Sequence, residues 1–151
     1  MGLVNVASSA SAWRGHQYYL NKKVKEYQKI SEIEYESIII GSNHEKYNVF
    51  INIEHPRKSK CNCPHADGSR IVCKHMIALF FSVFPNEAEI YLKRQEELER
   101  EAEEWDQELD RKVLAHIKKM SKAELQQALI EVLDNCEDWI FNRFIRNNID
   151  F

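Results

Sequence analysis

The chain lacks the segments that mark membrane and secreted proteins. No apolar run approaches the roughly 18 residues that a membrane-spanning helix needs. Residues 1–6 hold no basic residue and lead into no long apolar core, so we expect no signal peptide. Position 6 is Val, not the Ser or Thr of a myristoylation signal. We therefore expect a cytoplasmic protein without membrane contact.

The sequence also lacks the motifs of common catalytic sites. It contains no HExxH, no P-loop, no GxGxxG and no GxSxG. Glu54 and His55 stand alone, and the zinc-deaminase signature of His-x-Glu with Cys-x-x-Cys is missing. We therefore expect that this protein is not an enzyme.

The composition is typical of a soluble globular protein, and the charge is unevenly distributed along the chain. Its 151 residues are enough for one domain or two small ones, and a hydrophobic content of 44% can form a core. Charged residues make up 30%, with a net charge of −3. Residues 1–80 carry a net charge of +4 and residues 81–151 a net charge of −7. This asymmetry predicts two functional surfaces.

Three of the four cysteines lie in one short segment with a histidine. The segment reads Cys61-x-Cys63, nine residues, then Cys73-x-His75. Three thiols and an imidazole in two tight pairs are a ligand set for one tetrahedral, structural zinc ion, because protein ligands fill all four positions. The alternative of two disulfides is disfavoured in a chain without a secretion signal. Cys136 lies far away, and we interpret it as a small buried hydrophobe.

The one-residue spacing within each pair predicts the local structure. Residues i and i+2 of a strand point to the same side, so Cys61 and Cys63 can face one ion from a strand end. On a helix such residues diverge, so Cys73 must lie at or before a helix start, with His75 in its first turn. His65 is an alternative fourth ligand; we favour His75, which precedes an apolar helix.

The pattern resembles the SWIM zinc finger, which has Cys-x-Cys, a variable spacer and Cys-x-His. The resemblance includes Pro64, which follows the first ligand pair, and Lys74, which lies between the two ligands of the second pair. It extends to the flanking segments 13–19 and 41–49 and covers roughly residues 8–85. It implies His75 as the fourth ligand and a non-catalytic, zinc-stabilised module that binds DNA or proteins. Such modules occur beside helicase-type ATPases, transposases and ubiquitin ligases.

We predict an α+β fold: a small three-stranded antiparallel sheet with a zinc-bound loop and helix, followed by an α-helical C-terminal region. The expected domains are residues 1–85, the zinc module, and residues 86–151, the acidic helical region. In the first, hydrophobic patterns predict a helix to about Leu20 and then three strands. These strands are expected at residues 24–30, 35–40 and 47–53, and the helix after the ligands at residues 76–84.

The second region should be helical throughout. Asn86 with Glu89, and Ser121 with Glu124, resemble capping boxes that start helices. An apolar stripe along the first of these helices is surrounded by acidic residues. It comprises Leu98, Ala102, Trp105, Leu109, Val113, Ile117 and Met120. We expect the C-terminal helices to form a small bundle. The acidic face of the first helix is either a solvated surface, a surface that docks a protein or mimics DNA, or an autoinhibitory arm.

Basic residues gather around the ligands. They are Arg57, Lys58, Lys60, Arg70 and Lys74, and Asp67 is the one acidic residue between positions 55 and 75. Such a patch can contact phosphates, with Trp13, Tyr18 or Tyr19 stacking on bases; otherwise the patch is a solvated surface and these aromatics belong to the core. We therefore expect DNA binding, with protein–protein interaction through the acidic helices, for example with a helicase-type ATPase, as the alternative.

Overall fold

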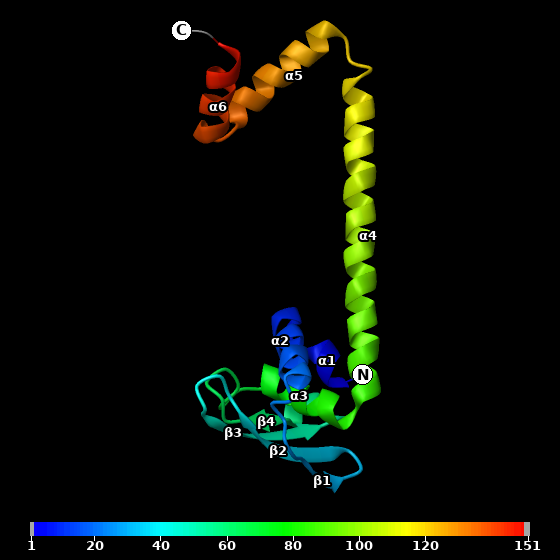
Figure 1. Ribbon diagram of the computed structural model, residues 1–151, viewed down its shortest axis with the longest axis vertical. Coiled ribbons are helices and arrows are strands. Elements are labelled where there is room, and N and C mark those ends of the chain that lie inside the picture. Colours follow the sequence, from blue (N-terminus) through cyan, green and yellow to red (C-terminus); the bar gives the residue numbers. More distant parts are fainter. Residues whose placement is uncertain (1, 150–151) are drawn as a thin grey trace. The chain divides into compact units, whose positions relative to one another are not determined.

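The computed structural model describes residues 2–149, and the chain divides into two compact units at Glu96 and Glu97 (Figure 1). The prediction of domains at residues 1–85 and 86–151 stays a prediction. The first residues of the helix that begins at Pro85 belong to unit 1, where Ala88 and Tyr91 are buried.

Unit 1 begins with two helices, α1 (Gly2–Val6) and α2 (Ser9–Leu20). The Ser8 hydroxyl caps α2 by accepting a hydrogen bond from the backbone N–H of Ser11, at 3.2 Å. Helix α2 was expected from the sequence, whereas α1 was not. Five residues without a capping signal are too short to give a helical period.

The sheet has four antiparallel strands in the order β1-β2-β3-β4, one more than predicted. They are β1 (Gln28–Ser31), β2 (Glu34–Ile40), β3 (Lys46–Asn52) and β4 (Lys60–Cys61). Strand β4 is two residues long and pairs with the middle of β3. A two-residue strand has no alternation to detect, which explains why three strands were expected.

The first strand is also shorter than expected. Residues 24–30 were predicted as a strand, but β1 begins at Gln28, and Val24 forms only an isolated bridge to Ile39. In contrast, β2 includes all of the segment predicted as a strand at residues 35–40, and Tyr35, Ser37 and Ile39 are buried on one face of it.

Helix α3 (Lys74–Val83) covers this buried face of the sheet, and α2 packs on α3 (Figure 1). Seven consecutive residues of α3 from His75 to Phe81 are buried, because the helix lies between the sheet and α2. Gly15 of α2 makes the close approach possible, since a Cβ there would lie 2.5 Å from the Cβ of Ile77. This packing forms the core of unit 1.

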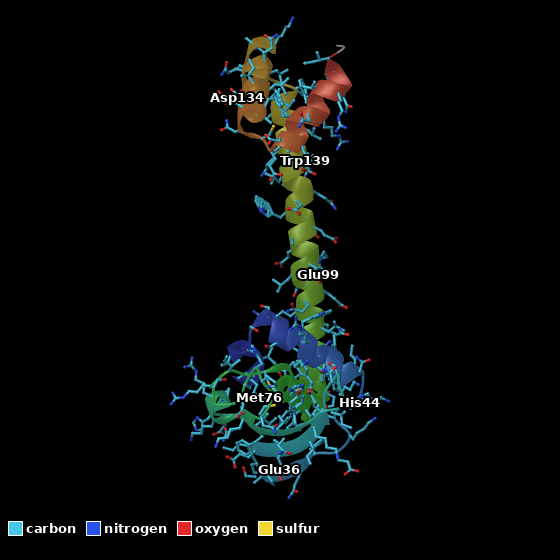
Figure 2. All side chains as sticks on the ribbon, turned by 90° about the vertical axis from the view of Figure 1, so that its left-hand side faces the viewer. Glu36, His44, Met76, Glu99, Asp134 and Trp139 are labelled. Atoms are coloured by element: carbon cyan, nitrogen blue, oxygen red, sulfur yellow. The ribbon has the colours of Figure 1, made fainter. Side chains whose placement is uncertain are left out.

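Within the described residues of unit 1, no helix covers the other face of the sheet (Figure 1). Figure 2 shows Met76 between the sheet and the helices, and Glu36 on the opposite side of the sheet. On this open face Ile38 is 57% exposed and Ile40 is 37% exposed. The sheet therefore has one core face and one face available for contacts.

Three helices complete the chain: α4 (Pro85–Ile117), α5 (Lys122–Asn135) and α6 (Asp138–Asn148). Helix α4 begins at Pro85, one residue before the predicted Asn86 cap, because Pro is favoured in the first helical turn. The capping box of α5 is confirmed, since Ser121 and Glu124 exchange side-chain to backbone hydrogen bonds of 2.7 and 3.3 Å. None of the helices among residues 2–149 is long and apolar enough to cross a membrane.

The C-terminal helices do not bury a core. No described residue from position 97 to 149 is buried, and Leu125, Leu129 and Val132 are exposed although their spacing of four and three residues places them on one side of α5. The Cys136 thiol, at the end of α5, is half-buried and donates a hydrogen bond to the carbonyl of Leu133. Unit 2 therefore presents its apolar side chains at the surface.

Candidate metal centre

Strand β4 and the start of α3 position the four predicted ligands. Cys61 ends β4, Cys73 is the N-cap of α3, and His75 lies in the first turn of this helix. Cys63 is followed by a turn in which the backbone N–H groups of Ala66 and Asp67 both donate to its carbonyl oxygen. The order of strand, loop and helix start is the one that the ligand spacing predicted.

The four side chains converge at one buried point. The sulfur atoms of Cys61, Cys63 and Cys73 and a ring nitrogen of His75 lie within 4.8 Å of one another. His75 Nδ1 is 3.7 Å from Cys61 Sγ and 4.0 Å from Cys73 Sγ. Around tetrahedral zinc, sulfur and nitrogen ligands are about 3.6 Å apart, and two sulfur ligands about 3.8 Å apart. The distances and the donor set fit one structural zinc ion.

The thiols differ in acidity. A hydrogen bond from the Cys61 thiol, with His75 and backbone amides of α3, lowers the pKa of Cys73 to about 4. The same interaction, together with burial, raises the pKa of Cys61, and burial raises the pKa of Cys63. Three adjacent thiolates repel one another, so the set ionises fully only around a cation. Zinc supplies this charge.

Aromatic rings hold the His75 imidazole in place. Tyr47 of β3 stacks on it with ring centroids 4.5 Å apart, and Tyr18 of α2 meets it edge-on at 5.3 Å. The Nε2 atom of His75 is buried and has no hydrogen-bond partner among the described residues. The packing of these two rings, rather than a hydrogen bond, therefore fixes the orientation of the ligand. Sequence reasoning missed this role; the alternation of β3 indicated only that Tyr47 faces inward.

The structure separates the two candidate histidines. His75 is 2% exposed and belongs to the cluster, whereas His65 is exposed in the loop and lies outside it. His75, and not His65, therefore completes the buried cluster.

The five predicted basic residues lie at different points around this centre. Arg57 and Lys58 lie on a 3-10 turn, η1 (Pro56–Lys58), Lys60 on β4 and Arg70 on the zinc loop. These four side chains are exposed. Lys74 is half-buried, with its ammonium group 4.6 Å from the ring centroid of Tyr18. We call Arg57, Lys58, Lys60, Arg70 and Lys74 the basic cluster.

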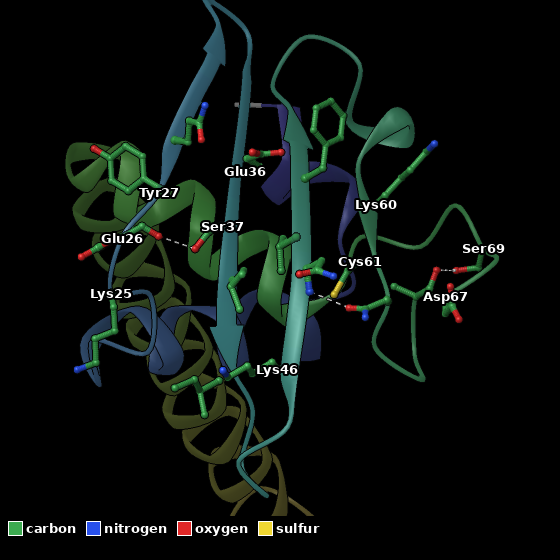
Figure 3. A pocket seen from close by; sticks show the side chains of 18 of the residues that line it. Lys25, Glu26, Tyr27, Glu36, Ser37, Lys46, Lys60, Cys61, Asp67 and Ser69 are labelled. Atoms are coloured by element: carbon green, nitrogen blue, oxygen red, sulfur yellow. Dashed lines mark hydrogen bonds between the residues drawn. The ribbon is translucent and has the colours of Figure 1, made fainter.

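A groove of about 1160 Å³ runs over the open face of the sheet (Figure 3). Lys60 lies opposite Phe50 in the β3–β4 pair, and both line the groove, while the next residue, Cys61, is buried. The groove combines basic, acidic and apolar side chains. Lys25, Lys46, Glu26, Glu36, Asp67, Tyr27 and Ile38 also line it. No sequence pattern indicated this groove, since its residues come from five separate segments, at positions 25–28, 36–40, 46–50, 60–62 and 66–69.

The proposed base-stacking aromatics have different surroundings. Tyr18 and Tyr19 pack against the core of unit 1, as in the alternative interpretation of the sequence. Trp13 is 45% exposed, and Tyr27, which lies beside the groove, is 48% exposed. Two exposed aromatic rings are therefore present in unit 1, and one of them lies next to basic side chains.

A buried site with three cysteines and one histidine, closed by four protein ligands, defines a zinc-stabilised module. The family model for the SWIM zinc finger matches residues 47–84, a segment that includes all four residues of the cluster. Comparisons with curated proteins and with solved structures found no match.

Proposed function

We propose that unit 1 binds nucleic acid through the basic cluster. One observation carries this proposal: Arg57, Lys58, Lys60 and Arg70 are exposed and form no ion pair with any described carboxylate. Cations without a protein counter-charge are available to neutralise phosphates, and this term dominates non-specific nucleic-acid affinity. The zinc ion supports the surface by fixing β4, which carries Lys60, and the loop that carries Arg70.

The groove suggests which form of nucleic acid is preferred. Lys60 of the basic cluster shares it with Lys25 and Lys46, and Tyr27 and Phe50 offer aromatic rings beside these charges. Single strands bind where cations follow the backbone and aromatic rings stack on bases. Glu26, Glu36 and Asp67 also line the groove, so the charge balance favours moderate affinity with strong salt dependence.

The test is a fluorescence-anisotropy titration of labelled single- and double-stranded DNA with the zinc-loaded full chain at two salt concentrations. We expect K58E/K60E to weaken binding at least tenfold. The slope of log K against log salt concentration should also become shallower, by about 0.7–0.9 for each phosphate that the variant no longer neutralises. The matched control is K29E/K93E, which changes the net charge equally away from the zinc site. Lys74 is left unchanged because it packs on Tyr18.

Two results would overturn the proposal. One is the absence of binding to either strand form at low salt, and the other is an equal loss of affinity in K58E/K60E and K29E/K93E. The second outcome would mean that only net charge matters, not the surface around the zinc.

A second candidate function is a protein adaptor, which the exposed apolar side chains of unit 2 favour. The partner suggested by the family resemblance is a helicase-type ATPase. A pull-down with unit 2 variants separates the candidates, because a protein partner would be lost on changing unit 2 and retained in K58E/K60E. Location in the cytoplasm remains a prediction.

A further inference from the structure

The part of α4 that lies in unit 2 carries an apolar stripe without any cover. Its members are Leu98, Ala102, Trp105, Leu109, Val113 and Ile117, all exposed, with Trp105 at 56%. Their spacing of three or four residues places them on one side of the helix. A row of this length with large side chains is typical of a contact surface. The question is which partner has the matching shape and charge.

The charges along this helix are strongly polarised. Residues 96–110 hold nine acidic residues and a single basic one, Arg100. Residues 111–122, which run from the last turns of α4 to the first residue of α5, hold five basic residues and no acidic one. A parallel pair of such helices would place acid against acid. An antiparallel pair places the acidic segment of each helix against the basic segment of the other, which is the favourable arrangement.

The apolar stripe is also nearly symmetric on reversal. Inverting the helix about residues 107 and 108 places Leu98 on Ile117 and Ala102 on Val113. In a twofold interface both copies use the same surface patch, so this patch must match its own reversed copy. This property is specific to self-association and would be coincidental for an unrelated partner.

We propose that this face of α4 binds the same helix of a second copy of this chain, antiparallel. In a twofold pair the same flank of each helix meets. One flank of α4 carries Glu97, Glu101, Glu108 and Lys112, spaced by 4, 7 and 4 residues, and Lys119 follows seven residues later in the turn after the helix ends at Ile117. The reversal places Glu97 beside Lys119 of the second copy, and Glu101 between its Lys112 and Lys119.

The remaining charges limit the strength of the pair. Glu108 would face itself near the twofold axis, but Arg111 and Lys112 of its own helix already pair with it. The opposite flank holds Glu99, Asp106 and Asp110, which have no basic counterpart there. The dimer should therefore be weak enough to depend on protein concentration.

The experiment uses two charge-reversal variants of the zinc-loaded full chain, E97K/E101K and K112E/K119E. Each alone would set like charges against each other across the pair, whereas their equimolar mixture restores every opposite pair. By sedimentation velocity up to about 200 µM, we expect a dimer for the wild type, monomers for each variant, and a dimer for the mixture. Helix content should stay constant, because the ion pairs that the changes remove within α4 are exposed and contribute little to stability.

Each other outcome overturns the proposal. A monomeric wild type over the whole concentration range leaves no self-association to explain. Dimers in both variants place the interface elsewhere, and a mixture that stays monomeric contradicts antiparallel pairing. If one variant loses helix content, mixing L98C with I117C in a C136S background gives a second test, since antiparallel helices alone bring positions 98 and 117 together. A disulfide that formed equally within each variant alone would contradict that orientation.

Discussion

The imidazole of His75 stacks on the ring of Tyr47, with ring centroids 4.5 Å apart and ring planes 26° apart. Tyr47 is the second residue of β3, and its hydroxyl donates a hydrogen bond to Glu45 at the turn before this strand. The ligand on α3 is thus oriented by the sheet, not by its own helix. Partners of this kind commonly tune metal affinity because they hold the ligand in its binding orientation.

The first prediction concerns this stacking. Replacement of Tyr47 by Ala should weaken zinc binding about 10–100-fold, the usual effect of removing a group that orients a ligand. Tyr47→Phe keeps the ring and removes only the hydroxyl, so it should retain zinc like the wild type. Transfer of zinc to a fluorescent chelator measures both. Equal zinc retention in Tyr47→Ala and the wild type would show that the ring has no orienting role.

The second prediction concerns the metal and the folding of unit 1. Cys63→Ser, or a chelator, should unfold this unit, because zinc binding contributes on the order of 10 kcal/mol in small zinc modules. Near-UV circular dichroism and amide exchange of α3 report the loss. Cys136→Ser is the control, since Cys136 lies outside the cluster and should leave zinc content unchanged. A Cys63→Ser protein that stayed folded in chelator would contradict the structural role of the ion.

The third prediction concerns the contact between α2 and α3. Ala at position 15 adds a methyl group 2.5 Å from the Ile77 Cβ and 2.8 Å from the Lys74 carbonyl oxygen. Although Ala favours helices, this overlap should lower the free energy of unfolding by about 1–3 kcal/mol. Arg14→Ala, at an exposed position of the same helix, is the control. Thermal unfolding of zinc-loaded protein compares them, and an unchanged or raised Tm for Gly15→Ala would refute the close approach.

The fourth prediction concerns His16, which is 2% exposed and has no partner for Nδ1 among the described residues. Burial lowers its pKa. The groups facing it are uncharged aromatic rings: Trp13 and Tyr19 of α2, Phe81 of α3 and Tyr91 of α4. The folded protein therefore keeps His16 neutral, whereas the unfolded chain takes up a proton near pH 6.5.

The sign of this effect follows from linkage. A lowered folded pKa means that the stabilisation is complete above about pH 6.5 and is lost as the pH falls below it. His16→Phe keeps a ring and removes the titration, so its Tm should depend less on pH between 7.5 and 5.5 than that of the wild type. Zinc release in acid affects both proteins, and the difference between them isolates His16. Parallel Tm curves would mean that His16 does not titrate on unfolding.

The sequence predicted the zinc site well because its information is local. The spacing of Cys61, Cys63, Cys73 and His75 restricts the backbone to a strand end and a helix start. Ser121 and Glu124 likewise predicted the start of α5, since a capping box involves residues three apart. By contrast, β4 and α1 are too short to leave a periodic pattern, and the packing of Tyr47 on His75 joins residues 28 positions apart.

The sequence by itself thus determined the three cysteine ligands, the helix start at Ser121 and the polarity of charge along the chain. The tertiary structure alone decided which histidine completes the site, which face of the sheet stays open, and that the inward-facing pattern of Leu125 and Leu129 finds no core within one chain. The physical reason is that ligand spacing and capping are short-range constraints on the backbone. Burial, in contrast, depends on which surfaces meet, and amphipathic helices show which face is apolar without showing what covers it.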